Sequence, residues 1–249
     1  MCTVVILRRP EHDWPVLIAA NRDEMRDRPW RPPARHWPDR PDVVAGLDEL
    51  AGGSWLGIND HGVVAAMLNR VDSLGPAPGK RTRGELVLEA LDHADAADAA
   101  EALVALNGLS YRSFNLLIAD SRDAFWLRHD GDRAIEVRPL ARGLSMLTAH
   151  DVNATESSRV REYLPRFEAV PVPEPETGDW QSWEALLASR DSAPGQAPFG
   201  AMRIETATGF GSVNSSLIGL PRPTLDQRRP IWRFAGAAPG DQPFVEVPV

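Results

Sequence analysis

The chain carries its only cysteine at position 2, directly before a run of apolar residues, and this placement constrains the fold more than any other feature. A small second residue generally permits removal of the initiator methionine, which would leave Cys2 with both a thiol and a free α-amino group. Their reference pKa values, about 8.5 and about 7.7–8.0, make a nucleophile and base within one residue feasible at neutral pH. Val4, Val5 and Ile6 predict a buried strand that fixes this end inside the fold. A lone cysteine also packs as a small hydrophobe, so position alone leaves both roles open.

The composition is that of a soluble globular protein. With 249 residues and 43% hydrophobic content, the chain predicts a single domain over residues 1–249. A net charge of −8 without a Lys/Arg-rich run argues against nucleic acid as the main partner. One cysteine forbids an intrachain disulfide and a multi-thiolate metal site, and this suits a reducing compartment, so we expect a cytoplasmic protein. No apolar run of about 18 residues predicts a membrane span.

Two hairpins are predicted in the first third of the chain. The first strand turns at residues 8–13 and pairs with Trp14–Ala20, which brings the polar cluster Asn21–Glu24 beside Cys2. The second hairpin joins residues 52–59 to residues 63–70 through a tight turn. Between them, residues 29–41 are too rich in proline for a helix or an inner strand. We expect an ordered loop there, which either borders a pocket or is held to the core by its two tryptophans.

The remainder of the chain predicts helices in the middle and strands at the end. Capping patterns at Thr82–Glu85 and Asn153–Glu156 precede helical spacing, and Asp179 is expected to cap a further helix. Short apolar runs predict a meander over residues 114–119, 124–127, 134–137 and 144–148, and closing strands over residues 201–207, 211–220 and 230–234. Strands at both ends around a helical middle favour an α+β fold with packed sheets covered by helices.

Several motifs in the first half resemble one known family. They are Met1-Cys2-Thr3, Asn21-Arg22-Asp23-Glu24, the run from Gly52 to Gly57, Asn69-Arg70, Arg83-Gly84-Glu85-Leu86 and the run from Ser113 to Leu117. The set is similar to the NRDE family, also called the transport-and-Golgi-organisation-two family. That family resembles the cysteine N-terminal-nucleophile hydrolases, such as bile salt hydrolase and penicillin V acylase. The resemblance implies a four-layer αββα sandwich and hydrolysis of a linear amide.

Carried over residue by residue, the resemblance implies four catalytic positions. Cys2 resembles the nucleophile with its own amine as base, and Arg22 resembles the basic residue that favours the thiolate. Asp23 resembles the carboxylate that binds the N-terminal amine, and Asn69 the amide donor to an oxyanion. Structural alternatives stay open for each: an Arg22–Asp23 pair that ties down a hairpin end, and a strand-end turn at Asn69.

The later motifs depart from the family pattern. Residues 144–151 lack the asparagine that such acylases place after the middle strands, and no late arginine matches. Asn153 and His150 are the replacements in view, although Asn153 also fits a helix cap. The segment Gly211–Ser216 offers only small polar residues that could line the same cavity. The candidate substrate-binding residues are Asn21, Trp30, Trp37, Arg70, His150 and Asn153.

These features favour a cysteine amidohydrolase acting on a small or lipidic amide, with no metal and no added cofactor. The alternative that the resemblance implies is a non-catalytic carrier of haem, acyl lipids or acyl-coenzyme A on the same fold. A scaffold domain without a polar pocket is the third hypothesis. The partner is expected to be a small-molecule or lipid-like ligand, and the sequence does not indicate an oligomeric state.

Overall fold

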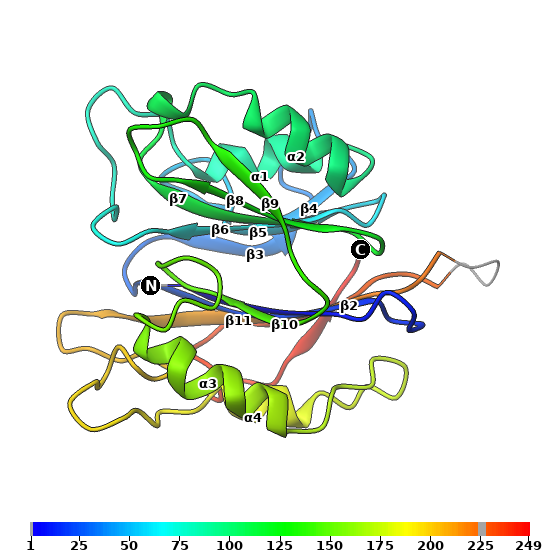
Figure 1. The fold of residues 1–249 in the computed structure, drawn as a ribbon, viewed down its shortest axis with the longest axis vertical. Coiled ribbons are helices and arrows are strands. Elements are labelled where there is room, and N and C mark those ends of the chain that lie inside the picture. Colours follow the sequence, from blue (N-terminus) through cyan, green and yellow to red (C-terminus); the bar gives the residue numbers. More distant parts are fainter. Residues whose placement is uncertain (1, 224–227) are drawn as a thin grey trace.

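The chain folds into two antiparallel sheets stacked face to face, with helices on both outer faces (Figure 1). The structure is a computed structural model and describes residues 2–223 and 228–249. Helices α1 and α2 cover one sheet, and α3 and α4 cover the other (Figure 1). This arrangement is the αββα sandwich that the sequence predicted.

The first sheet contains the N-terminal strand in an inner position. Its order is β10-β1-β2-β11-β12-β13. The strands are β1 (Thr3–Arg8), β2 (Val16–Met25), β10 (Gly143–Leu147), β11 (Phe210–Leu220), β12 (Ile231–Ala235) and β13 (Val245–Val247). Because β1 is hydrogen-bonded on both sides, to β10 and β2, the start of the chain is held between two neighbours.

The second sheet is a meander in sequence order, from β3 to β9. The strands are β3 (Trp30–Ala34), β4 (Val43–Asp48), β5 (Leu56–Asn59), β6 (Val64–Asn69), β7 (Phe114–Ala119), β8 (Ala124–His129) and β9 (Glu136–Pro139). The predicted hairpin from residue 52 to residue 70 forms as β5 and β6.

Four α-helices and one short 3₁₀ helix complete the described part of the chain. They are α1 (Gly84–Leu91), α2 (Ala96–Val104), the 3₁₀ helix η1 (Gly108–Ser110), α3 (Ser158–Ala169) and α4 (Gln181–Leu187). Helix α1 packs on β5 and β6, whereas α3 packs on β10 and α4 on β2. None of the helices among the described residues is both long and apolar enough to cross a membrane.

Strand alternation sorts the apolar residues into three cores. Val4 and Ile6 point into the layer between the two sheets, whereas Val5 points to the helix-covered face with Trp183. A third core lies between the second sheet and α1 and α2. The N-terminal strand is therefore buried on both faces, which explains why it reads as a continuous apolar run.

The structure corrects several predicted elements. Residues 30–34, expected as a loop, form β3 at the edge of its sheet, where two prolines remove no inner hydrogen bond. Strand β10 leaves the predicted meander and pairs with β1 in the other sheet. Residues 201–207 form no strand, only an isolated bridge from Glu205 to Gly211. The cap of α3 is Ser157, which accepts from the Val160 N–H, and not Asn153.

One irregularity in β11 matters for the site. The register between β11 and β2 shifts at a bulge: Ser212 pairs with Asp23 and Asn214 pairs with Arg22, so Val213 is the extra residue. In a regular strand Ser212 and Asn214 would share one face. The bulge instead directs Ser212 to the helix-covered face and Asn214 to the layer between the sheets.

Candidate active site

Three polar side chains, Cys2, Arg22 and Asn214, lie side by side on neighbouring strands of the first sheet, at the strand ends near the start of the chain. The register of β1 and β2 pairs Thr3 with Asn21, so continuing it by one residue places Cys2 opposite Arg22. Arg22 in turn pairs with Asn214 on β11. Cys2 packs against the inter-sheet core, which places this row on the inner face of the sheet.

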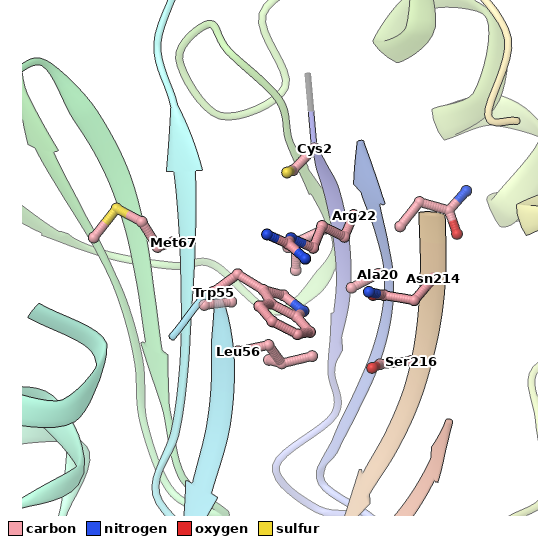
Figure 2. Close-up of a pocket in the computed structure, with 11 residues that line it drawn as sticks. Cys2, Ala20, Arg22, Trp55, Leu56, Met67, Asn214 and Ser216 are labelled. Atoms are coloured by element: carbon pink, nitrogen blue, oxygen red, sulfur yellow. The ribbon is translucent and has the colours of Figure 1, made fainter. Parts of the chain in front are cut away.

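A small cavity lies over this row, between the two sheets (Figure 2). Behind the row, Val4, Ala20 and Ser216 form a second, deeper row on the same face. Trp55, Leu56, Ala66 and Met67 of the opposite sheet close the other side. The cavity has a volume of about 10 Å³, enough for about one water molecule.

Arg22 is held in the cavity by an anionic and an aromatic contact. Its Nη2 donates to Asp48 Oδ2 at 3.0 Å, and its guanidinium carbon lies 4.1 Å from the centre of the Trp55 ring. Arg28 binds the same carboxylate through both Nε and Nη2. The Arg22 side chain is only 4% exposed, and this burial lowers the pKa of its guanidinium. Nearby Cys2 and Asp48 raise the same pKa and so partly offset the effect of burial.

Asp23 lies on the opposite face of β2 from Arg22, so these neighbours in sequence form no ion pair with each other. Its Oδ2 accepts from Arg159 Nη1 at 3.0 Å, and its Oδ1 accepts from Ser212 Oγ at 2.6 Å. Arg159 also donates to Thr3 Oγ1, next to Cys2. Both members of the Asp23–Arg159 pair are buried. Arg159 and Ser212 thus help to fix a carboxylate beside the start of the chain.

The Cys2 thiol is not made acidic by its surroundings. Its Sγ donates to the Asp23 backbone carbonyl at 3.7 Å. Burial raises the pKa of the thiol, the Asp23 carboxylate raises it further, and Arg22 lowers it by a smaller amount. Arg22 thus favours the thiolate, as the resemblance implied, but its effect is smaller than those of burial and the Asp23 carboxylate. Arg83, whose own pKa burial lowers to about 10, also favours negative charge at Cys2.

Asn69 ends β6 and pairs with Phe114. Phe114 belongs to the core under α1 and α2, so the Asn69 side chain lies on that face of the sheet and not on the face toward Cys2. Its role as an amide donor to an oxyanion stays a prediction. Arg70 is engaged elsewhere: its Nη1 lies 2.8 Å from both Asn115 Oδ1 and Asp151 Oδ1.

The other predicted binding residues are spread over the molecule. Asn21 is buried on the helix-covered face, where its Nδ2 donates to the carbonyls of Leu187 and Met202. Trp30 contacts the cavity residue Trp55 edge to face, with ring centres 5.8 Å apart, and does not itself line the cavity. Trp37 packs instead against the core under α1 and α2.

His150 and Asn153 have structural contacts. The His150 carbonyl accepts from Asn115 Nδ2 at 2.7 Å, a contact that links the two sheets. Asn153 Oδ1 accepts from the Met146 N–H at 2.7 Å, and its φ of 57° is left-handed, which asparagine tolerates. Asn153 therefore closes the end of β10, and its contacts match neither the predicted helix cap nor a cavity position.

The sequence did not single out Asp48, Arg159 or Asn214 as site residues. Asp48 and Arg159 come from distant parts of the chain and meet β2 only through the sheet packing. Asn214 belongs to the small polar segment that the sequence suggested could line a cavity, and the bulge at Val213 decides which of its members do so. Among the described residues, no group of three or more His, Cys, Asp or Glu side chains could hold a metal ion.

The two stacked antiparallel sheets covered by helices form an N-terminal-nucleophile hydrolase-like fold. The structure is similar to an N-acylethanolamine-hydrolyzing acid amidase ortholog from Caenorhabditis elegans, with a TM-score of 0.59 and 13% identity over 87% of this chain and 92% of that one. It is also similar to a conjugated bile acid hydrolase variant from Clostridium perfringens (TM-score 0.57, 12% identity, 99% and 92% coverage). Penicillin V acylase from Agrobacterium tumefaciens gives a TM-score of 0.52 at 14% identity, over 95% and 83% of the chains. At such identities the likeness concerns the fold.

The chain belongs to the Transport and Golgi organisation 2 family, whose profile matches residues 1–190. The mouse homologue is 35% identical over 108 residues and the bovine homologue 38% identical over 110 residues. Each match covers 42% of this chain and 38% of the relative. The matched region therefore spans well under half the length of these relatives. The resemblance drawn from the motifs is confirmed.

Proposed function

We propose that the chain, after removal of Met1, is an amidohydrolase that cleaves a linear amide of a small or lipidic substrate through a Cys2 acyl-enzyme. The observation that carries the proposal is the position of Cys2. Its side chain faces a cavity beside Arg22, and the Asp23 carboxylate is fixed on the other side of the chain end by Arg159 and Ser212.

Because burial raises the pKa of the Cys2 thiol, the thiolate needs a base to form, and we assign that role to the α-amine. In this scheme the α-amine of Cys2 takes the thiol proton, and Asp23 stabilises the resulting ammonium. The thiolate attacks the amide carbon, the ammonium gives its proton to the departing nitrogen, and the C–N bond breaks. Water then attacks the thioester with the amine again as base, which releases the acid and restores the thiol. Arg22 stabilises the thiolate when it attacks the amide and again when it leaves the thioester.

The test compares three forms of the protein on a panel of N-acyl amides. Intact mass first establishes whether Met1 is absent from the purified protein. We expect turnover and a Cys2 acyl adduct in the processed protein, and neither in Cys2→Ala. A form with an N-terminal extension keeps the thiol but places the amine in a peptide bond, so it should be inactive as well. Turnover that is equal in all three forms would contradict the mechanism.

The carrier hypothesis has one supporting observation, a surface hollow of about 400 Å³ beside Trp30. Arg26 and Arg203 line it, and its volume lies in the range of small-molecule sites. The small volume of the Cys2 cavity, in contrast, does not accommodate haem. Titration with haem and with acyl-coenzyme A, monitored by tryptophan fluorescence, tests this second function. Absence of saturable binding of both ligands would remove it.

A further inference from the structure

The loop after β6 contains Lys80, which is the only lysine of the chain. Residues 70–83 connect β6 to α1 at the end of the sandwich where the chain starts (Figure 1). The Val71 N–H donates to the Ala149 carbonyl at 3.2 Å. The register of β1 and β10, continued by two residues, places Ala149 opposite Cys2. This loop therefore borders the strand pair that holds Cys2.

A surface hollow of about 400 Å³, which we call the Lys80 hollow, lies between this loop and the residues that lead into β7. Its volume lies in the range of sites for small molecules. Its polar and charged lining residues are Asp72, Ser73, Lys80, Arg112 and Ser113. Of the described residues that line the hollow, only Asp72 is acidic. The lining therefore carries more positive than negative charge.

The two lining cations bond to uncharged oxygens. Lys80 Nζ donates to the Leu109 carbonyl at 2.6 Å. Arg112 Nη2 donates to the Asp72 carbonyl at 2.7 Å, and its Nη1 donates to other carbonyls of the loop. In the described ranges, 2–223 and 228–249, neither cation forms an ion pair with a carboxylate. An ammonium has three donors, so Lys80 keeps two for a ligand.

Arg83 adds a third positive charge behind the wall of the hollow. Its Nη1 donates to Ser73 Oγ and to the Ser113 carbonyl, each at 2.9 Å, and both serines line the hollow. Burial and neighbouring Arg112 lower the pKa of the Arg83 guanidinium to about 10, so it remains charged at neutral pH. An anion in the hollow would offset the repulsion between these cations.

We propose that the Lys80 hollow binds a phosphate group, either free or in a small monoester. Lys80 and Arg112 donate to the phosphate oxygens, and Arg83 attracts the group from behind the wall. A phosphate monoester carries about 1.5 to 2 negative charges at pH 7 on three oxygens, which suits three cations better than one carboxylate does. The site does not depend on the proposed amide hydrolysis.

The single lysine gives the site its own reporter. Protein made with lysine carrying ¹³C at Cε gives one lysine signal in NMR spectra, and this signal belongs to Lys80. We expect phenyl phosphate, added at pH 7.5 and constant ionic strength, to shift the signal in a saturable way. Phenyl sulfate has a similar shape but one negative charge, so it should bind at least about fivefold more weakly. Inorganic phosphate, titrated in parallel, shows whether the site prefers the free ion or the ester.

Two variants test which side chains hold the phosphate. Calorimetry should show that Lys80→Met weakens binding of phenyl phosphate at least about tenfold, because a charge-assisted hydrogen bond is lost. Lys80 is exposed, so this variant is expected to fold. Arg161→Met is the matched control, because Arg161 is an exposed cation on α3 that also donates to a backbone carbonyl, that of Thr155. It should leave the affinity unchanged.

Three results would overturn the phosphate site. They are the absence of a saturable shift with both phosphate probes, equal affinity for phenyl phosphate and phenyl sulfate, and wild-type affinity in Lys80→Met. An equal loss in Lys80→Met and Arg161→Met would also overturn it, because the attraction would then come from the overall charge and not from the hollow.

Discussion

Replacing Arg159 with methionine should destabilise the fold strongly, because it removes a buried cation that contacts the buried Asp23 carboxylate. The two side chains are 4% and 0% exposed, and Nη1 lies 3.0 Å from Oδ2. Removing one member of a buried pair typically costs about 3–5 kcal/mol. Ser212 still donates to the other carboxylate oxygen, so we expect a loss near the lower figure, about 3 kcal/mol in the free energy of unfolding.

Urea unfolding followed by circular dichroism measures this loss, and two further variants make it specific. Arg26→Met breaks the exposed ion pair with Glu205 and should cost far less, because solvent screens such pairs. Combining Arg159→Met with Asp23→Leu removes both charges and should recover a large part of the loss. If Arg159→Met costs no more than Arg26→Met, the buried pair does not have the energetic role argued from its burial.

Three further predictions follow from contacts of the same region. Because burial raises the pKa of the Cys2 thiol, the free energy of unfolding should fall as pH rises above about 8.5, and Cys2→Ala should abolish this decline in urea titrations at several pH values. Gly46→Ala would place a Cβ 2.3 Å from the Trp55 ring, so it should cost about 1–3 kcal/mol and shift the tryptophan emission; unchanged emission would contradict the contact. Asn115→Leu should cost about 3 kcal/mol or more, because it removes both donations that the amide makes to the carbonyls at the end of β10; a loss below about 1 kcal/mol in urea would show that these contacts are dispensable.

The N-terminal strand and its hairpin were predictable because local pattern and tertiary burial agree there. Val4 and Ile6 face the core between the sheets and Val5 faces the core under the helices, so this apolar run is typical of a strand that is covered on both faces. Strand β10 shows the opposite case. Its sequence predicts a strand, but nothing local states that its partner is β1, which lies more than 130 residues earlier.

The candidate site was predictable in part for the same reason. Cys2, Arg22 and Asp23 could be found from their motifs, since a hairpin brings the second strand beside the first. The face of the sheet on which each side chain lies could not be predicted, because it depends on the register between the strands. Arg159 escaped prediction because its partner Asp23 is distant in sequence, and an arginine in the first turn of an amphipathic helix is usually exposed.

The extra residue at Val213 means that one strand serves two chemically separate compartments within three positions. On one side Ser212 steadies a carboxylate, and on the other Asn214 faces the cavity. Ser212 and Asn214 can therefore be substituted independently during evolution, because a change at one position does not alter the face on which the other lies. Deletion of Val213 would end this independence: restoring regular alternation would turn Ser212 and Asn214 to one side, and one of the two compartments would lose its hydroxyl or amide.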